Sequence, residues 1–233
     1  MLAAALGLAA CQSAPPAPAP VAAAAPTRFA ADMERFAAAD RASLPAPCQV
    51  LFVGSSSIVR WTSLVADMAP LPVINRGFGG SQTEDVNARF DNVVTPYKPR
   101  AIVYYAGDND INAGKPPGEV VANFQRFMAM KDARVGKAVP VYFISLKPSK
   151  SRLAQLPAQA QANAEIRRMA ERRRDLTFID VVPAMMQDGK PKEIFVADGL
   201  HMTPEGYAIW KSVVGPVVKR NTEREARACQ RRG

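Results

Sequence analysis

The sequence predicts a single α/β domain whose parallel sheet carries helices on both faces. Five short apolar runs alternate with stretches that have apolar residues at helical spacing. Three polar, glycine-containing segments each follow one of the apolar runs, as loops at the carboxyl edge of a parallel sheet do. The chain has 233 residues, 48% of them hydrophobic, which is enough to bury one sizeable core.

The expected elements follow one another in a regular order. A helix over residues 29–42 precedes the first strand. The predicted strands are short and almost wholly apolar, as strands buried on both faces are: residues 49–53, 72–75, 101–105, 139–145 and 176–179. The predicted helices between them carry apolar residues on one side and charge on the other: residues 58–68, 83–93, 118–135 and 159–174.

The last helix has a clear start signal. Thr203 is a good N-cap, and Pro204 fits the first helical position because its missing N–H would have no partner there. Apolar residues then continue through Trp210 and Val214. We expect Pro216 to kink or interrupt this helix.

The N-terminal residues are predicted to lie outside the folded domain. Residues 1–11 look like a lipoprotein-type signal segment, because the motif Leu-Ala-Ala-Cys that ends at Cys11 resembles the bacterial lipobox. We therefore expect lipidation of Cys11, a membrane tether, and a bacterial cell-envelope location facing the periplasm. No positive charge precedes the apolar stretch, which leaves open a translation start further upstream or a cytosolic protein with a low-complexity leader.

Two further segments complete the expected organisation. Residues 12–27 are almost wholly Ala and Pro and are predicted to form an extended tether. Residues 28–233 are predicted to form the globular domain, which ends in a basic helix. After the leader the sequence has no apolar run of transmembrane length.

The charge pattern excludes several function classes. Lys and Arg number 30 against 21 acidic residues, and the excess lies in short runs that we interpret as solvated helix faces, with attraction to an anionic envelope surface as the alternative. No nucleic-acid motif accompanies it. A single histidine and scattered cysteines do not make a zinc site, and the glycine loops lack both P-loop and dinucleotide spacing. We expect no metal, no cofactor and no nucleic-acid partner.

The cysteine count fits an oxidising compartment. If Cys11 is lipidated, Cys48 and Cys229 remain as an even pair that can bond in the periplasm. Two unrelated thiols are the alternative.

The polar segments after the strands contain the parts of an acyl-transfer site. Such chemistry needs a nucleophile, a base, a group that orients the base, and donors aimed at an oxyanion. The first strand is followed by three serines, and the second and third by loops that contain Gly80 and Asn109. His201 is the only imidazole, and Asp198 lies three residues before it. In a parallel sheet all four segments reach the same edge.

Residues 54–58, 77–80, 107–110 and 198–201 resemble, in order, the four sequence blocks of the SGNH hydrolases, also called the GDSL esterase/lipase family. The resemblance covers about residues 50–210. It implies a flavodoxin-like, three-layer α/β/α fold with a five-stranded parallel sheet and the activity of a serine esterase on acyl or acetyl esters. Carried over by position, Ser56 is the nucleophile and Asp198 and His201 complete the triad. Gly80 and Asn109 then join the Ser56 backbone in the oxyanion hole.

The first block departs from the family pattern. The family usually has Gly-Asp-Ser, whereas Ser55 stands at the aspartate position here, so Ser55 and Ser57 remain alternatives to Ser56 as nucleophile. The Gly-Ser-Ser-Ser opening is similar to that of a bacterial branch of the family. A catalytically inactive envelope-binding lipoprotein on the same scaffold is the alternative function.

Substrate contacts are less well defined by the sequence. We expect a small-molecule, glycan or lipid ester as partner, and four residues near the motifs are candidates to line its site: Arg60, Trp61, Phe78 and Gln82. Trp61 has a core position as its alternative. Asp108 and Asp110 are expected to brace a turn rather than form a glycosidase pair. Lys147 follows the fourth strand, where it faces either solvent or a negative group of the substrate, and we favour solvent.

Overall fold

The computed structural model describes residues 28–220 and 222–231. The predictions about the signal segment, Cys11 and the tether concern residues outside the described ranges. Among the described residues, no helix is both long and apolar enough to cross a membrane.

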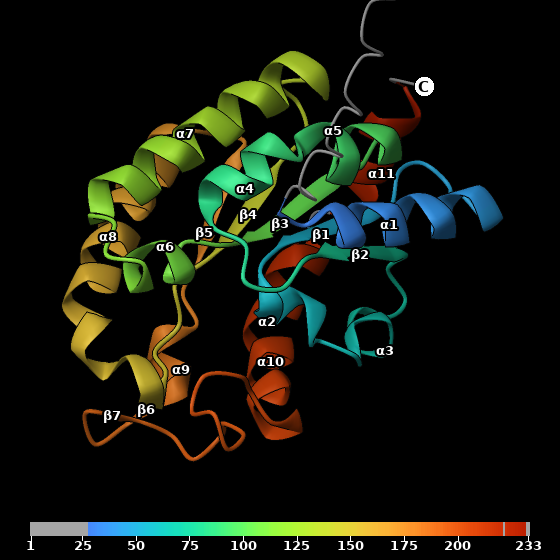
Figure 1. Cartoon of the computed structure of the whole chain (residues 1–233). Helices are drawn as coiled ribbons and strands as arrows, with labels where there is room; N and C mark the ends of the chain where they lie inside the picture. Colours follow the sequence, from blue (N-terminus) through green and yellow to red (C-terminus); the bar gives the residue numbers. More distant parts are fainter. Residues whose placement is uncertain (1–27, 221, 232–233) are drawn as a thin grey trace, which may run out of the picture.

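A five-stranded parallel sheet forms the middle layer (Figure 1). Its strands lie in the order β2-β1-β3-β4-β5, and every neighbouring pair is parallel. They span Val73–Gly77, Val50–Gly54, Ala101–Tyr105, Val141–Ile144 and Leu176–Ile179, in that spatial order. The three strands β1, β3 and β4 are buried along their whole length, because side chains on both faces pack against helices.

Each face of the sheet has its own hydrophobic core. One core is covered by α1 (Ala30–Ala42), α4 (Thr83–Ala88), α5 (Phe90–Val93), α7 (Pro117–Arg134) and α8 (Leu156–Arg172). The other is covered by α2 (Ser56–Val59), α3 (Leu64–Met68), α9 (Val182–Met185) and α10 (Pro204–Arg220). The fold is therefore the expected three-layer α/β/α arrangement, with a flavodoxin-like sheet.

The remaining elements are short or peripheral. They are α6 (Asp108–Asn112), α11 (Thr222–Gln230), the 3₁₀ helices η1 (Thr95–Tyr97) and η2 (Lys150–Gln155), and the two-residue strands β6 (Met186–Gln187) and β7 (Lys190–Pro191). Strands β6 and β7 pair as an antiparallel hairpin that the sequence did not predict.

Two of the predicted helices are broken. The helix expected over residues 58–68 is α2 and α3 with a turn between them, where the side chains of Trp61 and Ser63 both donate to Asp67 Oδ2. These local bonds replace helical ones. The helix expected over residues 83–93 is divided at Arg89, whose ψ of 11° is outside the helical range.

Pro216 does not interrupt the last helix, one of the two outcomes expected for it, because α10 continues through it to Arg220. Pro216 is on the exposed side of the helix, where water reaches the backbone carbonyl that lacks its partner. The preceding residue, Gly215, has no Cβ to clash with the proline ring. Val214 and Val218 hold the buried side against the sheet.

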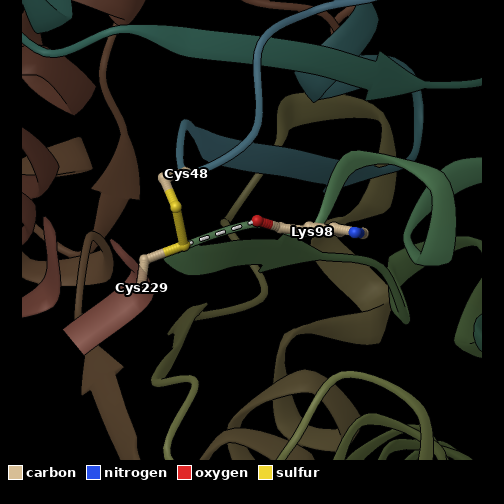
Figure 2. The surroundings of a disulfide bond; sticks show 3 residues. All are labelled: Cys48, Lys98 and Cys229. Atoms are coloured by element: carbon tan, nitrogen blue, oxygen red, sulfur yellow. Dashed lines mark hydrogen bonds between the residues drawn. A yellow bond between two sulfur atoms is a disulfide. The ribbon is translucent and has the colours of Figure 1, made fainter. Parts of the chain in front are cut away.

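Cys48 and Cys229 are joined by a disulfide bond (Figure 2). The bond connects the segment just before β1 to α11, across a sequence separation of 181 residues. The Lys98 carbonyl oxygen accepts from the backbone N–H of Cys48 at 3.1 Å, and Cys229 Sγ lies 3.6 Å from the same oxygen. The last described helix is thereby fastened to the amino edge of the sheet, away from the strand ends that carry the polar segments.

Candidate active site

The carboxyl ends of the strands bring the polar segments together. β1 is followed directly by the three serines, β2 by the loop with Gly80, and β3 by α6, whose first turn contains Asn109. The segment with Asp198 and His201 comes after β7 and ends where α10 begins.

Gly54 sets the direction in which the chain leaves β1. Its φ is +138°, a conformation that L side chains rarely adopt, and a Cβ there would lie 1.8 Å from the Tyr105 carbonyl oxygen. The next residue, Ser55, donates its backbone N–H to that same oxygen at 2.9 Å. The end of β1 is thus pressed against the end of β3, and α2 begins immediately afterwards.

The three serines differ in their surroundings. Ser55 and Ser57 are buried, and the Ser57 carbonyl accepts from the Tyr207 hydroxyl. Ser56 is partly exposed, and its Oγ lies 2.8 Å from Nε2 of His201. Of the three hydroxyls, therefore, the one on Ser56 faces the imidazole.

Asp198 holds the other side of the imidazole ring. Its Oδ2 lies 2.6 Å from Nδ1 of His201, and its Oδ1 accepts the backbone N–H groups of Leu200 and His201 at 2.8 and 2.9 Å. The bond from the His201 side chain and the two backbone bonds hold the pKa of the Asp198 carboxyl well below its usual range. An ionised Asp198 keeps the proton on Nδ1, which leaves Nε2 free to accept from Ser56.

The loop that carries His201 is fastened from several sides. The Gly199 carbonyl accepts the backbone N–H of Ser151 at 3.0 Å, and the His201 carbonyl accepts that of Val196 at 2.9 Å. The Leu200 carbonyl accepts Nζ of Lys147 at 2.7 Å. The imidazole is therefore attached to a fixed backbone.

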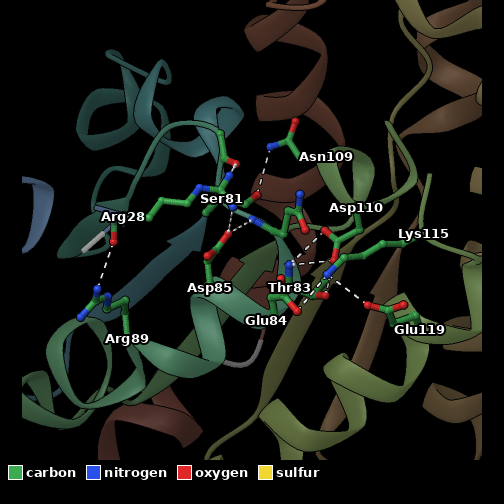
Figure 3. A network of polar contacts seen from close by, with 12 residues as sticks. Arg28, Ser81, Thr83, Glu84, Asp85, Arg89, Asn109, Asp110, Lys115 and Glu119 are labelled. Carbon is green, nitrogen blue, oxygen red and sulfur yellow. Dashed lines mark hydrogen bonds and ion pairs between the residues drawn. The ribbon is translucent and has the colours of Figure 1, made fainter. Parts of the chain in front are cut away.

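The loop that contains Gly80 and the first turn of α6, which contains Asn109, are connected through Ser81 (Figure 3). Asn109 Nδ2 donates to the Ser81 carbonyl at 3.0 Å, and the Gly80 carbonyl accepts from Arg28 at 2.8 Å. The φ of Gly80 is +77°, and a Cβ built on it meets nothing within 4 Å, so its backbone borders open space.

The buried carboxylate of Asp110 adds a connection between α6 and the start of α4. Asp110 accepts both the backbone N–H and the hydroxyl of Thr83, which lies at the start of α4. Burial raises the pKa of Asp110, although the bonds from Thr83 act against this. Asp108 forms an ion pair with Arg152 at 3.0 Å. Both aspartates thus connect α6 to other elements, Asp110 to the start of α4 and Asp108 to η2, instead of bracing a turn of their own.

A family model describes the same stretch of chain. The model for the GDSL-like lipase/acylhydrolase family matches residues 43–209. The chain belongs to this GDSL-like family. It is therefore a member of a family of hydrolases, and the serine, glycine, asparagine and histidine segments described above all lie within the matched residues.

Solved structures show how widely this GDSL-like fold is shared. A GDSL-like lipase from Bacteroides thetaiotaomicron is 21% identical, with a TM-score of 0.69 over 82% of this chain and 98% of that one. A Streptococcus pneumonia protein whose name refers to platelet activating factor is 20% identical, with a TM-score of 0.70 over 81% and 91%. A carbohydrate esterase family 3 protein from Talaromyces cellulolyticus is 15% identical, with a TM-score of 0.60 over 76% and 98%. No curated protein matches the chain. At these identities the likeness shows the fold.

Two candidate substrate contacts of this GDSL-like protein are core residues instead. Trp61 is 1% exposed and packs between Phe52 and Trp210, and Phe78 is 0% exposed and contacts the ring of Phe29. Neither side chain reaches the surface beside Ser56, so their expected role in lining the site is wrong. An aromatic residue next to a motif is more easily explained by the adjoining core.

The other two candidates remain at the surface. Gln82 caps α4 and shares a capping box with Asp85, so its side chain is partly committed to the helix start. Arg60 is exposed at the end of α2 and stays a candidate. Within the described ranges no three residues of metal-binding type gather in one place.

Two of the buried cationic residues lie beside the candidate site, and neither was anticipated there. The expectation that Lys147 faces solvent is wrong, because it is 1% exposed and points its ammonium at the His201 loop. Burial lowers the pKa of Lys147 to about 8. Arg152 contacts both Asp108 and Asn109 from η2. Both residues follow β4, so the sheet-edge reasoning applied to the first three strands would have found them.

Proposed function

We propose that this GDSL-like protein is a serine esterase that hydrolyses carboxylic esters with acyl or acetyl groups. The observation that carries the proposal is the unbroken relay of 2.8 Å from Ser56 Oγ to His201 Nε2 and 2.6 Å from His201 Nδ1 to Asp198 Oδ2. A hydroxyl, a base and an ionised carboxylate in this order are the parts that covalent acyl transfer requires.

In the first half of the reaction, Ser56 Oγ attacks the ester carbonyl carbon while His201 Nε2 takes the hydroxyl proton. The carbonyl oxygen becomes an oxyanion, which accepts the backbone N–H groups of Ser56 and Gly80 and one N–H of the Asn109 amide. The C–O bond to the alcohol then breaks, and the imidazolium returns its proton to the departing oxygen. Ser56 is left as an ester of the acyl group.

In the second half, His201 removes a proton from a water molecule, and the hydroxide adds to the acyl carbon. The second oxyanion occupies the same donors. Its collapse releases the carboxylic acid and returns the proton to Ser56 Oγ. Asp198 stabilises the imidazolium in both halves without taking its proton.

Two single substitutions test the proposal. Ser56→Ala and His201→Ala each remove nearly all turnover of p-nitrophenyl acetate, with unchanged circular dichroism, because the parts act as a unit. A fluorophosphonate probe labels the wild type at Ser56 and does not label Ser56→Ala. Hydrolysis that survives His201→Ala contradicts the proposal, since the chain has no second histidine. A folded wild type that neither hydrolyses esters nor takes the label supports the inactive envelope-binding alternative.

The acyl group is addressed by a graded ester panel. Acetyl to long-chain p-nitrophenyl esters, together with acetylated oligosaccharides, separate a carbohydrate deacetylase from a lipase-like enzyme. A structural neighbour named for carbohydrate esterase family 3 makes acetylated sugars a sensible first substrate class. Selective turnover of long acyl chains would instead favour lipid esters.

The envelope location is a second part of the proposal. A disulfide between Cys48 and Cys229 supports an oxidising compartment. Lipidation of Cys11 predicts incorporation of radiolabelled palmitate in a bacterial host. Loss of the label in Cys11→Ala is the expected control, and labelling that persists there contradicts the assignment.

A further inference from the structure

Asn109 has an amide group that can be turned two ways. Its oxygen and nitrogen are almost the same size, so packing alone does not fix which of them faces the oxyanion position. Only the orientation that presents Nδ2 is useful, because Oδ1 would repel a developing negative charge. Something in the structure must therefore select the orientation.

Arg152 contacts the oxygen side of this amide. Its Nη2 donates to Asn109 Oδ1 at 2.8 Å, while Asn109 Nδ2 donates one of its two hydrogens to the Ser81 carbonyl at 3.0 Å. A guanidinium has donors and no acceptor. If the amide flipped, its NH₂ group would face the guanidinium and its oxygen would face the Ser81 carbonyl, so both hydrogen bonds would become repulsive contacts.

Arg152 is itself held in one position. Its Nη1 donates to Asp108 Oδ2 at 3.0 Å, and the side chains of both partners are less than a tenth exposed. Asp108 is adjacent to Asn109 in the chain, so one guanidinium contacts two neighbouring residues in the first turn of α6. The planar fork of an arginine is suited to two such contacts at fixed directions, whereas a lysine ammonium is not.

We propose that Arg152 is a positioning residue that keeps the Asn109 amide turned with its N–H toward the oxyanion. This inference rests on the proposed esterase function, in which Asn109 is one of three oxyanion donors. Arg152 does not contact the substrate and acts through Asn109. The contact with a full positive charge also polarises the amide, which makes the remaining N–H a stronger donor.

A double-mutant cycle tests the proposal. Arg152→Met lowers kcat for p-nitrophenyl acetate about 10²-fold with little change in KM, because one oxyanion donor is lost. The same change made in Asn109→Ala lowers kcat less than about threefold, since the residue through which Arg152 acts is already absent. An equal loss in both backgrounds would assign Arg152 a general structural role and overturn the proposal.

Arg173→Met is the matched control. Arg173 also pairs with two half-buried carboxylates, Asp132 and Asp175, but it lies just before β5 at the opposite edge of the sheet. It is expected to lower the melting temperature and leave kcat unchanged. If Arg152→Met does not fold, Arg152→Lys takes its place. A single ammonium reaches Asp108 or Asn109 but not both, so kcat still falls at least about tenfold, and only when Asn109 is present.

A spectroscopic measurement separates this proposal from the esterase assignment. In ¹⁵N-labelled protein the side-chain NH₂ of Asn109, identified by its absence in Asn109→Ala, has one hydrogen-bonded and one free proton. Arg152→Met is expected to accelerate exchange of that NH₂ with water and to draw its two proton shifts together. Unchanged signals would overturn the positioning role, whether or not the wild type hydrolyses esters.

Discussion

Asp198→Asn tests how the imidazole is oriented, because it replaces one carboxylate oxygen with an NH₂ group and leaves the size of the side chain unchanged. The carboxylate now accepts three hydrogen bonds, one from the His201 ring and two from backbone N–H groups. An asparagine has one oxygen to share among these donors. It keeps either the two backbone bonds or the bond from the ring.

The more stable arrangement is the inactive one. When Oδ1 of the new asparagine accepts the two backbone N–H groups, its NH₂ faces Nδ1 of His201 across 2.6 Å. Nδ1 must then accept, so the ring proton moves to Nε2, which lies 2.8 Å from Ser56 Oγ and no longer accepts its proton. If the asparagine amide turns round, its oxygen accepts from Nδ1 and His201 can again act as a base. The backbone N–H groups of Leu200 and His201 then face an NH₂ group and have no acceptor.

The free-energy cost of turning the asparagine amide determines how far kcat falls. Each donor left without an acceptor costs about 1 to 3 kcal/mol, so the active arrangement lies roughly 2 to 6 kcal/mol above the inactive one. We therefore expect kcat to fall by roughly 30- to 25,000-fold. Exposure of the Asp198 side chain to water places the effect toward the lower end of that range, because water satisfies some of the lost bonds.

The assay is steady-state hydrolysis of p-nitrophenyl acetate, with thermal melting of the same samples. Asp188→Asn is a matched control, since Asp188 is exposed in the β6–β7 turn with a φ of +50° that asparagine adopts readily. A decrease of less than tenfold in Asp198→Asn, with melting unchanged, would refute the view that Asp198 selects the imidazole tautomer.

Three further predictions concern stability. The pKa of Lys147 is lowered to about 8, against about 10.4 unfolded, so at this side chain the unfolded chain binds more protons between these values. Buried tyrosines with raised pKa values lose stability over the same range, so the measured quantity is the difference in free energy of unfolding between wild type and Lys147→Met. In urea titrations this difference should shift by about 2 to 3 kcal/mol in favour of the wild type from pH 8 to 10.5. Reduction of the Cys48–Cys229 bond, which encloses 181 residues of sequence, should lower the free energy of unfolding by about 5 kcal/mol in the chain-entropy model, and a Cys229→Ser variant should melt at the same temperature with and without reductant. Gly54→Ala should lower the free energy of unfolding by at least about 3 kcal/mol in denaturant titrations, because its positive φ disfavours a side chain and the new Cβ would clash with the Tyr105 carbonyl. Gly118→Ala in α7 is the control and should be neutral or stabilising, since a Cβ there meets nothing.

The strands were predictable because burial on both faces leaves a strong signal. The runs that form β3 and β5 begin and end at the residues expected from hydrophobicity alone. The helices were less predictable at their breaks. Nothing in the spacing of apolar residues says that Trp61 and Ser63 will bond to Asp67, or that Pro216 will sit on the exposed side of a helix held down by its neighbours. Tertiary contacts decide such points.

The site was predictable where it depends on the order of strands. The sequence placed Ser56, Gly80, Asn109 and His201 at one edge, and the structure brings them to that edge. Ser56 was chosen from the three adjacent serines only through the family resemblance, with Ser55 and Ser57 as alternatives, because the choice depends on the backbone direction that Gly54 sets at the end of β1. Lys147 was expected in solvent because long cationic side chains usually reach water, and only the packing of the His201 loop shows otherwise.

The buried cations beside the candidate site, Lys147 and Arg152, are expected to affect both the stability of the fold and the rate of ester hydrolysis. Burial disfavours the charged form of Lys147, as its lowered pKa indicates. Such a group destabilises the fold relative to an apolar residue of similar size. The Lys147 ammonium lies over the ring of Phe195 and donates to the Leu200 carbonyl beside His201, just as Arg152 reaches Asn109. If these cations served only the fold, apolar replacements would weaken both stability and activity. If they serve the site, Lys147→Met should unfold at higher denaturant concentration at pH 7 and yet turn over ester more slowly, because the loop that carries the imidazole loses its tie to β4.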